Sequence, residues 1–201
     1  MSAADPVSTQ RLRAVEYTAS QLRVIDAALE LFADHSVGGT SLQMIADAMG
    51  VTKAAIYYQF KTKNEIVVAA AETELSWLQA ALDVAEVQAT PALARETLLA
   101  QIIAVAIKRR RSVRALQNDP VIVRLLAEHE RFRHLIERLY HVLVGDDDRA
   151  DARVSAVILT GAIGTAATHP ILLDLDDDIL RAHLLHFARR LLDLAAHDER
   201  R

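Results

Sequence analysis

The sequence predicts an all-α protein, and three observations support this fold class. Hydrophobic residues make up 52% of the 201 residues, and the chain has only 6 Gly and 4 Pro. Alanine, leucine and arginine are the most frequent residues, and β-branched residues rarely alternate with polar ones, which favours helices over strands. Apolar residues also recur at helical spacing in most segments. A chain of this length is able to bury a sizeable core.

The composition also excludes several classes of protein. There is no cysteine, so disulfides, thiolate metal sites and cysteine nucleophiles are absent. The first ten residues lack the basic and apolar regions of a signal peptide, and the most apolar stretches are too short or too polar to cross a bilayer. No phosphate-binding loop, G-x-S-x-G or H-E-x-x-H motif occurs. We therefore expect a cytoplasmic protein without membrane association, enzymatic activity or cofactor.

The first segments predict a small N-terminal domain over residues 18–63. Residues 1–17 lack periodicity and are expected to form a flexible arm. From Thr18 onward, apolar residues line one helical face as far as Val37, and the Gly38-Gly39 pair is expected to end that helix. The members of this apolar face are Leu22, Ile25, Leu29 and Phe32.

The stretch SLQMIADAMGVTKAAIYYQF, residues 41–60, predicts two short helices joined by a turn. Ser41 and Thr52 are expected N-caps, and Gly50 stands where a left-handed residue ends the first helix. Val51 is expected to enter the core from the turn. Two helices of about two turns each, with a glycine between them, are typical of the helix-turn-helix motif.

Residues 64–201 are expected to form a second helical domain. Thr62, with Glu65 three residues later, predicts the N-cap of a long helix that continues to about Val87. Further helices are expected from Pro91 to about Arg111, from Asp151 to His169, and from about Asp177 to Ala196. Between them, the sequence NDP at 118–120 is expected to open a short helix, and the stretch RFRHLIERLYHVLVG continues to Gly145. The sequence DDDR at 146–149 is expected to form a loop.

The second short helix of the motif has an unusual outer face for a chain with 4% aromatic residues. A tyrosine ring contacts thymine methyls or sugars and its hydroxyl binds phosphate, while lysines neutralise phosphate. The outward residues are Thr52, Lys53, Ala54, Tyr57 and Tyr58, followed by Lys61 and Lys63; Gln43 on the preceding helix is able to bind adenine. The alternative is that the tyrosines pack on the long helix and the lysines are solvated. The formal net charge of −4 does not favour binding to nucleic acid. Residues 40–63 carry three lysines against one aspartate, so the local positive charge is small.

The segment Thr40 to Val67, TSLQMIADAMGVTKAAIYYQFKTKNEIV, resembles the DNA-binding segment of TetR-family transcriptional regulators. That family commonly shows T-x-x-x-I-A-x-x-x-G-V-S-x-G-x-L-Y-x-H-F-x-x-K-E-x-L. Here Ala54 replaces a frequent glycine and Gln59 a frequent histidine, so base preference does not carry over. The resemblance implies DNA contacts at Thr40, Ser41, Gln43, Thr52, Lys53, Ala54, Ala55, Tyr57, Tyr58 and Lys63.

The last two helices resemble those through which this family forms homodimers, as a four-helix bundle. Small residues on the first of them permit close helix approach, and the last helix carries an apolar stripe. The alternative is that these residues pack inside one protomer. The expected interface residues are Ala156, Thr160, Gly161, Gly164, Thr168, Leu184, Phe187 and Leu191.

The middle helices are expected to enclose a pocket for a small apolar or amphipathic effector. Its expected lining residues are Trp77, Gln101, Ile102, Leu125, His129 and Phe132. The alternative is a closed core without a ligand.

Other charged groups have simpler interpretations. The run KRRR at 108–111 suits a helix C-terminus, and Asp176–Asp178 suit a helix N-terminus better than a calcium loop. His134, Glu137 and His141 share one face but lack a wider cluster, so no metal site is expected.

The sequence therefore predicts a dimeric, ligand-responsive regulator that binds a palindromic DNA operator, most simply as a repressor released by a small molecule. The alternative is a helical dimeric scaffold or small-molecule-binding protein that does not read DNA.

Overall fold

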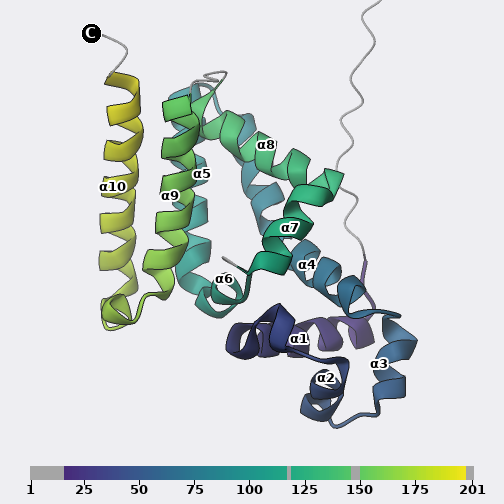
Figure 1. Cartoon of the computed structure of the whole chain (residues 1–201). Coiled ribbons are helices and arrows are strands. Elements are labelled where there is room, and N and C mark those ends of the chain that lie inside the picture. Colours follow the sequence, from purple (N-terminus) through teal and green to yellow (C-terminus); the bar gives the residue numbers. More distant parts are fainter. Residues whose placement is uncertain (1–15, 117–118, 146–149, 198–201) are drawn as a thin grey trace, which may run out of the picture.

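The computed structural model describes residues 16–116, 119–145 and 150–197, and all regular structure in these ranges is helical. The α-helices α1 to α4 form the first part of the chain, and α5 to α10 form the rest (Figure 1). Their bounds are α1 Ala19–Gly39, α2 Leu42–Met49, α3 Lys53–Gln59, α4 Lys63–Glu86, α5 Pro91–Lys108, α6 Arg110–Leu116, α7 Pro120–Glu128, α8 Glu130–Val144, α9 Ala150–Thr168 and α10 Asp177–His197, with a 3-10 turn at Pro170–Leu172.

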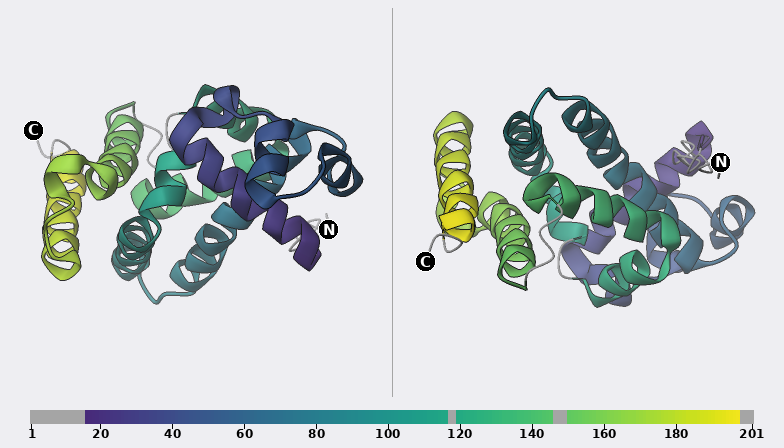
Figure 2. Two further views of the ribbon diagram at one scale, coloured as in Figure 1. Left: turned by 90° about the horizontal axis from the view of Figure 1, so that it is seen from below. Right: turned by 90° about the horizontal axis from the view of Figure 1, so that it is seen from above.

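The molecule is elongated, with α1 to α3 at one end and α9 and α10 at the other (Figure 1). Helix α4 leaves the first group and continues into the second. Helices α9 and α10 run side by side at the far edge, and the views from below and above agree on this arrangement (Figure 2). In the ranges that the structure describes, no helix is long and apolar enough to cross a membrane.

The N-caps of α2, α3 and α4 are those that the sequence predicts, and Thr18 caps α1 in the same way. The side-chain oxygens of Thr18, Ser41, Thr52 and Thr62 each accept a hydrogen bond from the backbone N–H three residues later. Gly50 ends α2 with φ of 64°, a left-handed conformation that glycine adopts without steric cost. Local side-chain chemistry therefore sets the boundaries of the helix-turn-helix motif.

The end of α1 differs from the prediction. The helical backbone breaks at Ser36, which has φ of 63° although it carries a side chain, and not at the following glycine pair. Surrounding hydrogen bonds stabilise the break. The Thr40 hydroxyl donates to the Ser36 carbonyl at 2.8 Å, and the Gly39 N–H donates to the Ser36 hydroxyl oxygen at 3.2 Å.

Two hydrophobic clusters form the core. One lies among α1 to α4 and also includes Ala115, Ile122, Leu125 and Phe132 from α6, α7 and α8. The other lies among α4, α5, α8, α9 and α10. Because the second half of the chain completes the core of the first, movements of α6 and α7 act directly on the packing of α1.

Two further details correct the sequence-based expectations. The helix expected from Pro91 to Arg111 is interrupted at Arg109. The short helix expected after 118–120 is α7, and α8 follows it after His129. Val51 does not enter the core, since 39% of it is exposed. The expected cap at Asp176 is present, with its carboxylate accepting from the N–H groups of Asp178 and Ile179. The DDDR segment lies outside the described residues.

Candidate nucleic-acid interface and internal pocket

The outer face of α3 is open to solvent. Tyr58 is 80% exposed and Tyr57 is 42% exposed, so Tyr58 does not pack on α4. The Lys53 ammonium lies 5.7 Å from the centre of the Tyr57 ring, within the range of a cation–π contact. Ala54 and Ala55 are also exposed, which leaves no bulky side chain beside the tyrosines. This face carries hydrogen-bonding, aromatic and cationic groups together.

The two capping residues and Gln43 have local partners. Ser41 and Thr52 are exposed, and each uses its hydroxyl oxygen to cap its own helix. The Gln43 amide donates to the Asp47 carboxylate at 2.7 Å along the exposed side of α2. A base contact by Gln43 therefore requires this surface hydrogen bond to exchange for one to DNA.

Two predicted DNA-contacting residues have a different position from the one expected. Thr40 is only 2% exposed, so its side chain is not available at the surface. The Lys63 ammonium donates to the backbone carbonyls of Val37 and Thr40, both at 3.0 Å. These contacts hold the turn between α1 and α2. The exposed cations of this region are Lys53 and Lys61, the latter 3.3 Å from the Tyr57 carbonyl.

A second set of contacts joins the start of α1 to α4 and α8. The Tyr17 hydroxyl donates to the Glu72 carboxylate, which also pairs with Arg131 of α8. Burial and the contact with Glu72 raise the pKa of Tyr17 well above its usual value, so the phenol stays protonated. The Tyr17 ring also lies 6.4 Å from that of Phe60, the residue that ends α3. The position of α3 is thus tied to α8.

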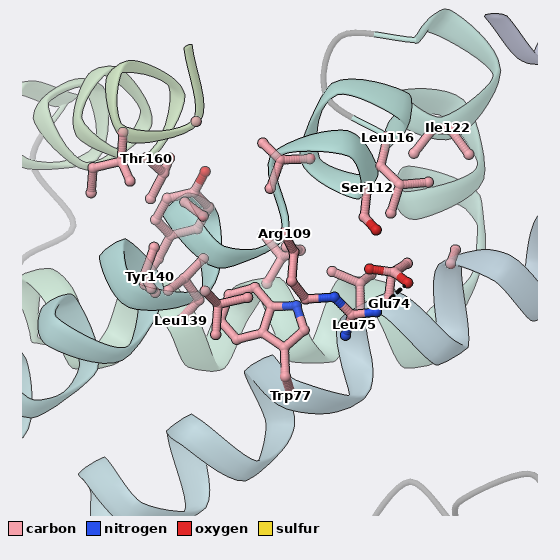
Figure 3. A pocket seen from close by; sticks show the side chains of 18 residues that line it. Glu74, Leu75, Trp77, Arg109, Ser112, Leu116, Ile122, Leu139, Tyr140 and Thr160 are labelled. Carbon is pink, nitrogen blue, oxygen red and sulfur yellow. Dashed lines mark hydrogen bonds and ion pairs between the residues drawn. The ribbon is translucent and has the colours of Figure 1, made fainter. Parts of the chain in front are cut away.

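A pocket of about 290 Å³ lies among α4, α5, α6, α8 and α9, on the side of α4 that faces the second half of the chain (Figure 3). Its wall is largely apolar, which is typical of small-molecule sites. Residues that line it include Leu75, Trp77, Ile102, Val113, Leu139 and Ile163.

The residues predicted to line an effector pocket lie in three different places. Trp77 and Ile102 line the pocket, but Gln101 is exposed and His129 lies exposed between α7 and α8. Leu125 and Phe132 are buried in the core around α1 instead.

The main polar group of the pocket is an ion pair between Glu74 and Arg109, neither of which is among the residues predicted from the sequence. The two side chains approach to 2.6 Å, and Figure 3 shows the Arg109 side chain extending past Trp77 to reach Glu74. Burial raises the pKa of the Glu74 carboxyl, although Arg109 and a hydrogen bond from Ser112 oppose this. The sequence contains one indication of this ion pair, since Glu74 is a charged residue on the otherwise apolar, buried face of α4.

The predicted dimer residues divide between the two sides of α9 and α10. Ala156 and Gly164 are buried within the protomer, whereas Thr160 is half-buried and lines the pocket. Gly161 is exposed, and Phe187 is 56% exposed. Thr168, Leu184 and Leu191 are half-buried. The exposed apolar face of these helices instead comprises Val154, Val157, Ile158, Ile179 and Phe187.

The fold and the exposed α3 surface define a helix-turn-helix protein with a helical second half. Residues 24–70 match the family model described as bacterial regulatory proteins, tetR family. This N-terminal segment of the chain is therefore similar to the TetR family of transcriptional regulators.

Curated relatives match the same region. The HTH-type transcriptional regulator AcrR of Shigella flexneri is 49% identical over 43 residues, which are 21% of this chain and 20% of the relative. The HTH-type transcriptional regulator SrpR of Pseudomonas putida is 41% identical over 59 residues, which are 29% of this chain and 28% of the relative. The matches thus span less than a third of these relatives.

Solved structures match almost the whole chain. The ketosteroid transcriptional regulator KstR2 of Mycobacterium tuberculosis has a TM-score of 0.67 at 17% identity, covering 91% of this chain and 97% of that one. A TetR-like transcriptional regulator from Rhodococcus sp. RHA1 has a TM-score of 0.67 at 22% identity, covering 89% and 98%. The fatty acid degradation regulator FadR from Bacillus halodurans has a TM-score of 0.65 at 16% identity, covering 88% and 96%. At these identities the matches establish the fold.

Proposed function

We propose that the chain is a homodimeric repressor that binds a palindromic DNA operator and is released when a small molecule enters the pocket. The observation that carries this proposal is the exposed face of α3, where Lys53, Tyr57 and Tyr58 are uncovered. An exposed aromatic pair next to cations has no folding role that would explain it, whereas DNA offers both apolar and anionic partners.

In the proposed complex, α3 of each protomer lies in a major groove. The two half-sites are then about one helical turn, roughly 34–36 Å, apart or slightly further. Lys53 and Lys61 bind phosphates, and the tyrosines contact bases, sugars or phosphates. Ser41, Thr52, Ala54 and Ala55 remain proposed contacts because they are exposed around the same helix. Lys63 and Thr40 act by holding the turn between α1 and α2.

The second protomer is proposed to cover the apolar outer face of α9 and α10. Val154, Val157 and Ile158 are each more than half exposed on α9, as are Ile179 and Phe187 on α10. An apolar face of this extent on two adjacent helices suits a self-complementary contact between two copies. Pairing two copies of α9 and α10 gives a four-helix bundle and fixes the separation of the two α3 helices.

The pocket is proposed as the effector site. Its apolar wall suits an apolar or amphipathic molecule, and the names of two structural relatives, a ketosteroid regulator and a fatty acid degradation regulator, agree with that class. Leu116 and Ile122 line the pocket, and they come from α6 and α7, which pack on α1. Ligand and DNA then act on one another through the position of α1, with an expected coupling of about 1–3 kcal/mol.

Titration of a duplex from the chain's own promoter region at two salt concentrations tests the proposal. Tight binding with a steep salt dependence is expected, because each phosphate contact releases counterions. The matched control is a duplex of the same length and base composition with a scrambled sequence. If both duplexes bind equally weakly at low salt, the scaffold function replaces the regulator.

A further inference from the structure

The ion pair in the pocket indicates what kind of ligand the pocket accepts. We infer that the pocket binds a small amphipathic carboxylate, with the carboxylate on Arg109 and the apolar part against Trp77 and its neighbours. This inference rests on one part of the proposed function, namely that the pocket is a ligand site. It adds the charge and the size of the ligand.

Exposure decides which member of the ion pair meets a ligand. The Arg109 side chain is 39% exposed, whereas that of Glu74 is 5% exposed. Glu74 also receives a hydrogen bond from Ser112, so both protein partners already surround its carboxylate. A cationic ligand would have to displace Arg109 to reach Glu74. The charge that the cavity presents is therefore positive.

Arg109 also has unused hydrogen-bonding capacity. One of its terminal nitrogens donates to Glu74, and its guanidinium has no other acceptor among the residues that the structure describes. A guanidinium carries five N–H donors in a planar fork that matches a carboxylate. A second carboxylate is thus able to bind Arg109 while the bond to Glu74 remains. A wholly apolar ligand would leave these donors without a partner and forgo that free energy.

The cavity volume limits the apolar part of the ligand. About 290 Å³ lies at the lower end of the range for small-molecule sites. The apolar lining includes Trp77, Leu139 and Tyr140, which Figure 3 labels, together with Ile102 and Ile136. This shape suits a medium-length alkyl chain or a single ring system better than a large fused one.

Trp77 provides a direct measurement, because it is the single tryptophan of the chain and lines the pocket. Octanoate, octanol and octylamine share one alkyl chain and differ in the charge of the head group. Titrating each into the full-length protein at neutral pH and following Trp77 fluorescence compares them at one site. Octanoate is expected to bind at least tenfold more tightly than the other two. Equal affinity for octanol, or tighter binding of octylamine, overturns the inference.

Variants of the ion pair test the role of Arg109. Glu74→Gln keeps the shape and removes the competing negative charge, so octanoate affinity is expected to stay equal or rise. The double variant Glu74→Gln with Arg109→Gln removes the guanidinium without leaving the buried Glu74 carboxylate unpaired. Its octanoate affinity is expected to fall at least tenfold, while its octanol affinity stays unchanged. The matched control is Arg114→Gln, since Arg114 is exposed and does not line the pocket. If the double variant binds octanoate as well as Glu74→Gln does, Arg109 is not the anchor.

The ligand titrations need no DNA, so they fail independently of the proposed function. Failure of the promoter duplex to bind would contradict the regulator and leave the preference for octanoate standing. Conversely, DNA binding with no preference for octanoate over octanol would contradict the ligand class alone. Circular dichroism of each variant, compared with the unmodified protein, confirms that the fold is retained.

Discussion

The Asp119 carboxylate accepts a hydrogen bond from the Val37 backbone N–H at 2.9 Å, across 82 positions of sequence. Its other oxygen accepts from the Val121 N–H at 2.8 Å and so caps α7. Val37 follows the break in α1 at Ser36, and its carbonyl accepts from Lys63. One peptide segment at the end of α1 is therefore held by α7 on one side and by α4 on the other.

Replacing Asp119 by alanine is expected to destabilise the fold. The Val37 N–H is left buried without an acceptor, at a cost of about 1–3 kcal/mol, and α7 is also left without its cap. Chemical denaturation measures the change in the free energy of unfolding. Asp174→Ala serves as the control because Asp174 is exposed. Equal stability of the two variants would show that the hydrogen bond to Val37 contributes nothing.

The two lysines on either side of α3 are expected to behave differently. Lys63→Ala removes the donor to two backbone carbonyls and is expected to lower stability by about 1–3 kcal/mol. Lys53→Ala is expected to change stability by less than about 0.5 kcal/mol, since Lys53 is exposed. DNA binding is expected to respond to Lys53→Ala more than to Lys63→Ala. For Lys53→Ala, the slope of log K against log salt concentration is expected to become less steep by about 0.9 for each phosphate that the protein no longer neutralises. Unfolding curves and DNA titrations at several salt concentrations measure both effects, and a large drop in stability for Lys53→Ala would contradict this assignment.

The difference between these lysines also shows how far sequence reasoning reaches. The caps at Ser41, Thr52 and Thr62 were predictable because each depends on a backbone group three residues away. The partners of Lys63 lie more than 20 residues before it and come near only when α1 packs on α4. A basic residue after a helix-turn-helix motif predicts a phosphate contact, and the local pattern contains nothing that indicates the carbonyls.

The same limit applies to the pocket. The apolar periodicity of α4 and α5 identified Trp77 and Ile102, because both lie on the buried faces of these helices. Arg109 lies at a break between two helices, and its partner Glu74 is 35 positions earlier. Where a helix ends within a run of good helix formers depends on tertiary packing, so the direction of Arg109 was not predictable.

Tyr58 is expected to act on DNA binding alone. It is 80% exposed, so Tyr58→Ala is expected to change the free energy of unfolding by less than about 0.5 kcal/mol. Removal of its ring and hydroxyl is expected to weaken binding to the promoter duplex by about 1–3 kcal/mol, the range for a good base contact. Val87→Ala is the matched control, since Val87 is 79% exposed and lies at the far end of α4. Unchanged DNA affinity for Tyr58→Ala would remove this residue from the interface.

The outer face of α10 is expected to control the oligomeric state. Phe187 is 56% exposed, and its ring centre lies 6.4 Å from that of His183 and 5.5 Å from that of His186. Phe187→Asp places a carboxylate in the proposed interface of both copies, where burial of unpaired charge is costly. Sedimentation velocity is expected to show a shift from dimer to monomer, and the promoter affinity is expected to fall because one protomer contacts one half-site only. Val84→Asp introduces the same charge at an exposed position on α4, so a dimer that persists in Phe187→Asp as it does in Val84→Asp would place the interface elsewhere.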